Sequence, residues 1–156
     1  MDVKEILKRQ VETSQEILEE LKTSKSPRVE ILLATNYAEL ILKDFMEFLL
    51  QTEEAREIPR QIIVDILENK GLIPKDLAYD VRQIFKIRDA YAHKPSLRQA
   101  NEFAEKEVLP NLNCVKEKTP KVENWEQRSL NQKIIDCSEW IFVNLRWYFE
   151  EIAGTI

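Results

Sequence analysis

Residues 27–50 read PRVEILLATNYAELILKDFMEFLL and form the most apolar segment of the 156-residue chain. The large apolar side chains follow helical spacing, but they cover more than one face of a helix. Such a helix must be buried on several sides, so we expect it at the centre of the fold or in contact with a partner chain. The polar residues within the segment exclude a membrane span: Glu30, Asn36, Glu39, Lys43, Asp44 and Glu47.

Helical patterns continue on both sides of this segment. Ser26 followed by Pro27 is typical of a helix start, with serine as the N-cap and proline in the first turn. Gly71 after a basic residue is typical of a helix end, and Pro95 favours a helix end near His93. The expected helices cover residues 2–23, 27–54, 58–69, 74–93, 96–108 and 126–153, with a charged loop at 110–124.

The composition limits the class of protein. The chain has only two glycines, whereas all-β domains use glycine freely in tight turns. We therefore expect a single all-α domain over residues 1–156, an up-and-down bundle of five to six helices. The net charge of −5 argues against a general nucleic-acid coat, so any contact with nucleic acid requires a local basic patch.

Motifs exclude several kinds of chemistry. The chain has no phosphate-binding glycine loop, no HExxH pair and no nucleophile motif, so we expect no cofactor and no metal beyond an all-carboxylate magnesium site. Cys114 and Cys137 match no metal spacing, and we expect reduced, partly buried thiols in a cytoplasmic protein. The first ten residues, MDVKEILKRQ, lack an uninterrupted apolar region, so we expect no signal peptide.

One basic stretch is a candidate site. Residues 87–96, IRDAYAHKPS, contain the only histidine, His93, five residues after Arg88. Residues 75–98 carry six basic and three acidic side chains in a chain that is acidic as a whole, and such a patch attracts anions such as phosphate. On a regular helix Arg88 and His93 lie about 140° apart. They converge only through the long arginine side chain, a loosened last turn or a second subunit.

Asp89 and His93 are four residues apart, so their side chains can touch on a helix. A carboxylate beside the imidazole would fix its tautomer and favour its protonated form, while Arg88 would offer a phosphate a rigid fork of donors. These are the parts of a metal-free site that cleaves phosphodiesters. The alternative is structural: a surface ion pair between Arg88 and Asp89, and a histidine that caps carbonyls.

The run GLIPKDLAYDVRQIFKIRDAYAHKPS, residues 71–96, resembles the signature region of HEPN domains. These helical bundles carry an arginine, a polar residue, and a histidine four to six residues after the arginine. With the apolar helix before it, the resemblance covers residues 27–95 and is nearest to the branch of the mannitol operon repressor. It implies a homodimer in which two such motifs face each other. In catalytic members the two motifs form a metal-independent endoribonuclease that promotes attack of the RNA 2′-hydroxyl on the adjacent phosphate.

Carried over by residue, the resemblance assigns phosphate binding to Arg88 and acid–base catalysis to His93. Asp89 would be the polar partner, where asparagine is more usual. Glu39 is a weaker candidate for orienting the site, with an ordinary solvated carboxylate as the alternative. We expect three neighbouring side chains to contact the substrate: Lys86, Tyr91 and Lys94.

Two functions stay open at this point. The first is an RNA- or nucleotide-binding protein with endoribonuclease activity, such as the toxin of a toxin–antitoxin pair. The second is a non-catalytic regulatory or scaffold module that binds a protein partner, such as an antitoxin or a transcriptional regulator. The retained arginine, aspartate and histidine favour the first, and the acidic remainder of the chain favours the second.

Overall fold

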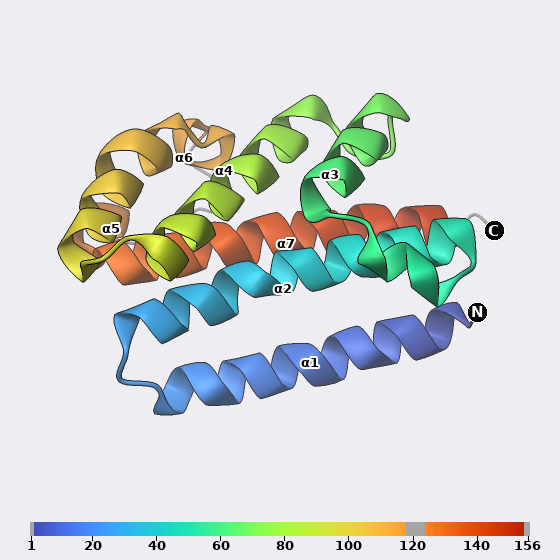
Figure 1. Cartoon of the computed structure of the whole chain (residues 1–156), viewed down its shortest axis with the longest axis horizontal. Coiled ribbons are helices and arrows are strands. Elements are labelled where there is room, and N and C mark those ends of the chain that lie inside the picture. The colour runs from blue at the N-terminus through green and yellow to red at the C-terminus, as the bar shows by residue number, and fades with distance from the viewer. Residues whose placement is uncertain (1, 118–123, 155–156) are drawn as a thin grey trace.

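The computed structural model describes residues 2–117 and 124–154 and consists of helices joined by short connections (Figure 1). No strand occurs among the described residues, so the all-α prediction is confirmed. The expected number of helices, five to six, is too low. The described residues form seven α-helices: α1 (Val3–Thr23), α2 (Pro27–Leu50), α3 (Arg60–Asn69), α4 (Lys75–His93), α5 (Leu97–Phe103), α6 (Asn113–Lys116) and α7 (Leu130–Gly154).

Short segments of 3₁₀- and π-helix connect several of these α-helices. A 3₁₀ segment, η1 (Glu53–Glu57), follows α2, which ends earlier than expected because Gln51 takes a left-handed conformation. A π-turn, η2 (Ala104–Val108), extends α5, so the expected helix at 96–108 is confirmed as a helix with an irregular second half. The 3₁₀ segments η3 (Leu109–Asn111) and η4 (Trp125–Gln127) lie on either side of α6 along the chain.

The expected loop at 110–124 is wrong in part because it contains α6; residues 118–123 lie outside the described residues. The buried carboxylate of Asp80, on α4, explains why a helix starts there. Its two oxygens accept hydrogen bonds from the backbone N–H groups of Asn113, at 2.7 Å, and Cys114, at 3.0 Å. Asp80 thus satisfies free donors at the start of α6 from another helix, as an N-cap residue does locally.

A pair of helices, α2 and α7, forms the centre of the fold (Figure 1). They run in the same direction and are joined by two edge-to-face contacts between aromatic rings. Tyr37 contacts Phe142 and Phe45 contacts Phe149, each with ring centroids 5.1 Å apart. Helices α1 and α4 run in the opposite direction and pack against α2 from different sides. The central position predicted for α2 is therefore confirmed.

Local sequence signals act as expected at several helix ends. The Ser26 hydroxyl accepts a hydrogen bond from the backbone N–H of Val29, and Gly71 takes a left-handed conformation with φ of 68°. Cys114 and Cys137 are unlinked thiols, and both are fully buried rather than partly buried. No helix within the described ranges is long and apolar enough to cross a membrane.

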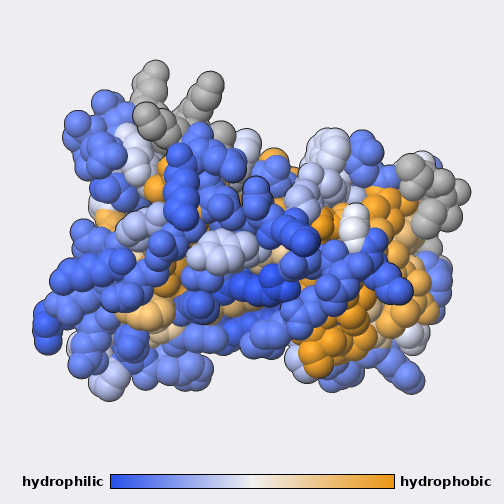
Figure 2. Space-filling view, turned by 90° about the horizontal axis from the view of Figure 1, so that it is seen from above, coloured by the Kyte–Doolittle hydropathy of each residue, from blue (hydrophilic) through white to orange (hydrophobic). Residues whose placement is uncertain are grey.

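Figure 2 shows the molecule from above, looking onto α3, α4 and α5. The face is largely hydrophilic over most of its area. Hydrophobic side chains gather mainly toward the end where α3 lies.

Candidate functional site

The C-terminal end of α4 carries His93 and is held in place by an arginine of α2. Lys94 precedes Pro95 and is extended, so the helix ends at His93. The guanidinium of Arg28 donates hydrogen bonds to the carbonyl oxygens of Tyr91 and, at 3.0 Å, of Lys94. A cation at this position stabilises a helix end, whose carbonyls lack helical partners and carry partial negative charge. Arg28 therefore fixes the helix end that presents the histidine.

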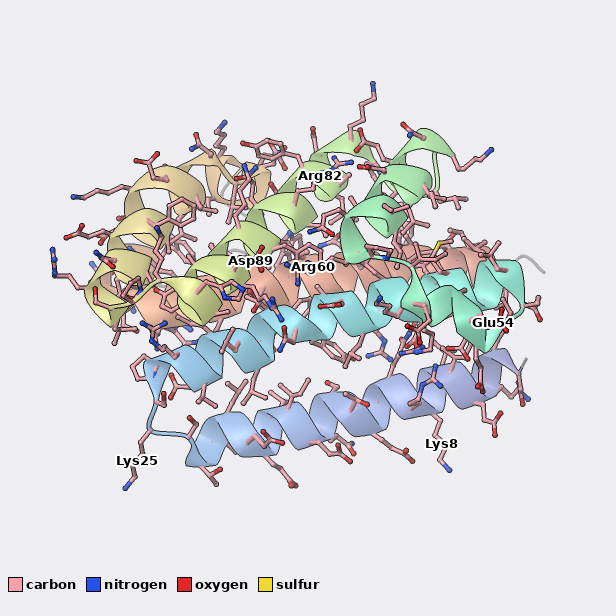
Figure 3. All side chains as sticks on the ribbon, in the orientation of Figure 1. Lys8, Lys25, Glu54, Arg60, Arg82 and Asp89 are labelled. Carbon is pink, nitrogen blue, oxygen red and sulfur yellow. The ribbon has the colours of Figure 1, made fainter. Side chains whose placement is uncertain are left out.

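Arg88 and Asp89 belong to a network that joins α2, α3 and α4. The Nε group of Arg88 donates to the side-chain oxygen of Asn36 at 3.1 Å. Its Nη1 group donates to Asp89 at 3.1 Å, and Arg60 of α3 donates to the same carboxylate oxygen at 2.6 Å. Figure 3 shows Asp89 and Arg60 pointing toward each other between α4 and α3. Asp89 is thus held between two guanidinium groups.

Arg60 is the most buried charge of this network, with a side chain only 10% exposed. Its guanidinium carbon lies 4.6 Å from the centre of the Phe85 ring, and its Nη1 group donates to Glu39 at 3.3 Å. Glu39 therefore lies at the edge of the site, bound to an arginine. Arg60 thus connects the two carboxylates of Glu39 and Asp89.

The expected contact between Asp89 and His93 is absent from the structure. Partial burial raises the pKa of Asp89, but hydrogen bonds from Arg60 and Arg88 outweigh this effect and hold the pKa below its usual value. Two guanidinium groups, which stay charged and present fixed donors, bind the carboxylate and leave it no need of the imidazole. Asp89 therefore turns toward α3 rather than along its own helix.

His93 is exposed, and its imidazole makes no hydrogen bond or ion pair with any described residue. The structural alternative, in which His93 caps carbonyls, does not hold for this side chain because Arg28 performs that role. The imidazole is therefore accessible to a ligand, but no described side chain fixes its tautomer.

Tyr91 cannot contact a substrate in this conformation, so that prediction is wrong. Its side chain points into the core with 1% of the residue exposed, and its hydroxyl donates to Asn101 at 2.5 Å. Burial raises its pKa to about 12. The two lysines are placed differently. Lys86 is exposed on α4, and the ammonium of Lys94 lies 5.1 Å from the centre of the Phe103 ring.

Two accessible groups near the C-terminal end of α4 could bind an anion. One is the guanidinium of Arg88, whose Nη2 group donates to no described residue and whose side chain is about one quarter exposed. The other is the free imidazole of His93. No cluster of three potential metal-ligating side chains occurs in the described part of the chain. The residues present therefore suit a phosphate bound by hydrogen bonds and charge.

Sequence reasoning missed Arg28 and Arg60, although a signal exists for both. Each lies in the first turn of its helix, where a positive charge opposes the helix dipole. An arginine at that disfavoured position indicates a partner elsewhere, and here each arginine binds a residue of α4: Arg28 binds Tyr91 and Arg60 binds Asp89.

Comparison with known proteins adds nothing to these residues: no family model, no curated protein and no solved structure matches the chain.

Proposed function

We propose that this chain is a HEPN-type protein that binds RNA or a nucleotide through Arg88 and His93. The observation that carries the proposal is the accessible fork of Arg88, oriented by Asn36 and Asp89, on the helix whose end presents a free imidazole. A guanidinium fixed by two acceptors keeps its remaining donors in a defined direction, which suits the oxygens of a phosphate.

A second copy of the chain completes the proposed site. Arg88 and His93 of one chain make no contact with each other, so one chain presents a phosphate clamp and an acid–base group separately. Apolar side chains on the surface of α2 support a dimer: the exposed Val29 and Leu40 and the half-buried Leu33 share one face with Asn36, the partner of Arg88. A symmetric contact through this face would bring two Arg88 side chains near one interface.

In the catalytic form of the proposal, His93 acts on the RNA 2′-hydroxyl. The imidazole accepts the hydroxyl proton as the oxygen attacks the adjacent phosphorus, and Arg88 stabilises the negative charge that grows on the phosphate oxygens. The bond from phosphorus to the 5′-oxygen of the next nucleotide breaks, that oxygen takes a proton from water and leaves as a 5′-hydroxyl, and a 2′,3′-cyclic phosphate remains. No metal is needed for this step.

One observation favours the non-catalytic alternative, a regulatory or scaffold module that binds a protein partner. The only carboxylate expected beside His93 is bound to Arg60 and Arg88, so the imidazole has no orienting partner in the described chain. A general base whose tautomer is not fixed is a weak catalyst. The two functions therefore differ in whether the chain binds and cuts RNA.

The test uses labelled single-stranded RNA with wild type, Arg88→Ala and His93→Ala side by side. Wild type should cleave the RNA in the presence of EDTA and leave 2′,3′-cyclic ends. His93→Ala should retain binding but lose turnover near neutral pH, because the group that moves the proton is gone. Arg88→Ala should weaken binding and reduce the slope of log affinity against log salt by about 0.7, the value of one lost phosphate contact on a single strand.

Lys8→Ala is the matched control for loss of a cation. Lys8 lies on α1, where it forms an exposed ion pair with Glu12, and Figure 3 places it far from Asp89. This variant should behave as wild type. RNA that is bound by wild type but never cut would support a binding module without catalysis. Absence of RNA binding in wild type would exclude the RNA-binding form of the proposal and favour the regulatory module.

A further inference from the structure

A groove of about 430 Å³ runs between α1 and α7, with α2 as its floor. It exists because α1 packs against α2 and does not close onto α7 (Figure 1). The volume falls within the range of about 300–1,000 Å³ that is typical of sites for small molecules. The groove lies on a different side of α2 from the α2 face that carries Asn36, so it is separate from the proposed RNA site.

Most of the side chains that line the middle of the groove are apolar. Ile17 and Leu18 of α1 face Phe142 and Val143 of α7, and Ala34 of α2 lies below them. Leu18 is 46% exposed and Val143 is 59% exposed, although both are large apolar residues on helices with polar faces available. Two such side chains across one groove indicate a surface that an apolar ligand covers.

Polar groups gather at one end of the groove. Ser14, Tyr37 and Arg146 come from three different helices and line this end together. The Ser14 hydroxyl and the Arg146 guanidinium lie close enough to the hydroxyl of Tyr37 to lower its pKa, although burial raises the pKa more strongly. The Tyr37 hydroxyl donates its proton to the backbone carbonyl of Gln10 at 3.0 Å, so it has no proton left for a ligand carboxylate, which would have to bind Arg146.

Arg146 lacks an acceptor for one of its donors. Its Nε atom is buried and forms no hydrogen bond with a described residue; the carboxylate oxygen of Glu150 lies 3.6 Å away. A buried charged donor without an acceptor costs free energy. A ligand carboxylate at this end would supply the missing acceptor.

The opposite end of the groove carries Lys22 and Glu30, whereas Glu139 lies between the two ends, four residues before Val143 on α7. The Glu30 carboxylate accepts a hydrogen bond from Asn131 at 3.1 Å. The ammonium of Lys22 balances the carboxylate of Glu30 at that end, whereas the Nε atom of Arg146 lacks a hydrogen-bond acceptor at the other, so an anionic head is attracted to Arg146. The charges of the groove therefore define the direction in which an anionic ligand lies.

We propose that this groove binds a small amphiphilic carboxylate, of the class of a medium-chain fatty acid. The carboxylate binds Arg146 beside Tyr37 and Ser14, and the hydrocarbon chain lies between Leu18 and Val143. The volume of the groove favours such a small ligand over a helix of a partner protein. A single helical turn, about 10 Å across and 5.4 Å long, already occupies about 420 Å³, so the groove cannot enclose a helix of useful length.

The experiment is calorimetric titration of the full chain with decanoate, and with decanol as its uncharged counterpart, below the concentration at which either forms micelles. Wild type should bind one decanoate per chain, and bind decanol at least about 10-fold more weakly because a charge-assisted hydrogen bond is lost. Arg146→Gln should weaken decanoate binding to the level of decanol. Val143→Glu should weaken both, because it places a charge in the apolar middle of the groove.

Two matched controls keep the result specific. Arg98→Gln removes another arginine that pairs with a glutamate four residues later, and Ile62→Glu charges another exposed apolar position. Both should bind decanoate within about twofold of wild type. Equal affinity of wild type and Arg146→Gln, or binding only at millimolar concentration, would overturn the proposal. So would self-association of wild type that Val143→Glu abolishes, because a second copy would then occupy the groove.

Discussion

Tyr91 and Asp89 are two residues apart on α4 and have opposite environments. The carboxylate of Asp89 lies near the surface between two guanidinium groups, so its charged form is stabilised. The phenol of Tyr91 lies in the core on Asn101, so its neutral form is stabilised. At the residue scale, the face of the helix on which a side chain falls decides whether it serves a site or the core.

Tyr91→Phe should lower the free energy of unfolding at neutral pH by about 1 kcal/mol, because the hydrogen bond to Asn101 is lost. At high pH the variant Tyr91→Phe should become more stable than wild type. The pKa of Tyr91 is raised from 10.0 to about 12 by folding, so the unfolded chain loses the proton first. The stability that Tyr91 contributes is present below pH 10 and is lost as pH rises, by about 2 kcal/mol at pH 12.

Urea unfolding at pH 7, 10 and 12 measures this crossover. Tyr79→Phe, an exposed position on the same helix, is the control and should leave stability at pH 7 unchanged. A constant difference between wild type and Tyr91→Phe across the three pH values would contradict the prediction.

At the scale of elements, α1 is attached to the core by a cluster of charges. Asp44 and Glu47 of α2 have side chains only 3% and 4% exposed. Arg9 of α1 donates to these carboxylates at 2.7 and 3.2 Å, and Arg56 of η1 donates to both at 2.5 Å. Gln10 of α1 donates to the second oxygen of Asp44 at 2.9 Å. The cluster joins three elements through one pair of buried carboxylates.

Asp44→Asn should destabilise the fold by about 2–4 kcal/mol, because two arginines and an amide donor then face a neutral group in a buried position. Hydrogen exchange should increase first in α1, since Asp44 is the acceptor for two side chains of that helix. The control is Lys8→Gln, which breaks the exposed pair with Glu12 and should cost less than about 0.5 kcal/mol. Uniform exchange across all helices in Asp44→Asn would show that α1 does not open on its own.

At the scale of the whole molecule, α2 has neighbours on most sides but not on all. It contacts α1, α3, α4 and α7, and twelve of its residues are buried. The remaining face carries Val29 and Leu40 in solvent beside Asn36. This face is the part of the central helix that the single chain leaves uncovered.

We expect sedimentation at micromolar concentration to give twice the chain mass of 18.5 kDa. Leu40→Glu should shift the protein to the mass of one chain, because a buried charge without a partner opposes association. The control is Val143→Glu, an equivalent change on α7, which should leave the dimer intact. A wild type that sediments as one chain would remove the composite Arg88–His93 site and the catalytic form of the proposed function.

Helix identity and most helix ends follow from the sequence because the interactions that determine them are local. Backbone hydrogen bonds join residues four apart, and caps such as Ser26 and Gly71 act within one turn. The apolar pattern of residues 27–50 also predicts that this helix lies at the centre of the fold or against a partner chain, because several of its faces must be buried. The position of Arg88 and His93 near the end of α4 follows from Pro95 in the same way.

Only the tertiary structure decided which groups meet across helices. Asp80 binds the backbone at the start of α6, 33 residues later in the chain. Arg60 binds Asp89, 29 residues later, so that Asp89 does not contact His93. Arg28 binds the C-terminal end of α4, 63 residues later. The burial of Tyr91 and the groove beside Arg146 likewise depend on how the helices pack. Helical periodicity gives the relative direction of side chains along one helix, but the neighbour each one meets is set by the packing of that helix against others.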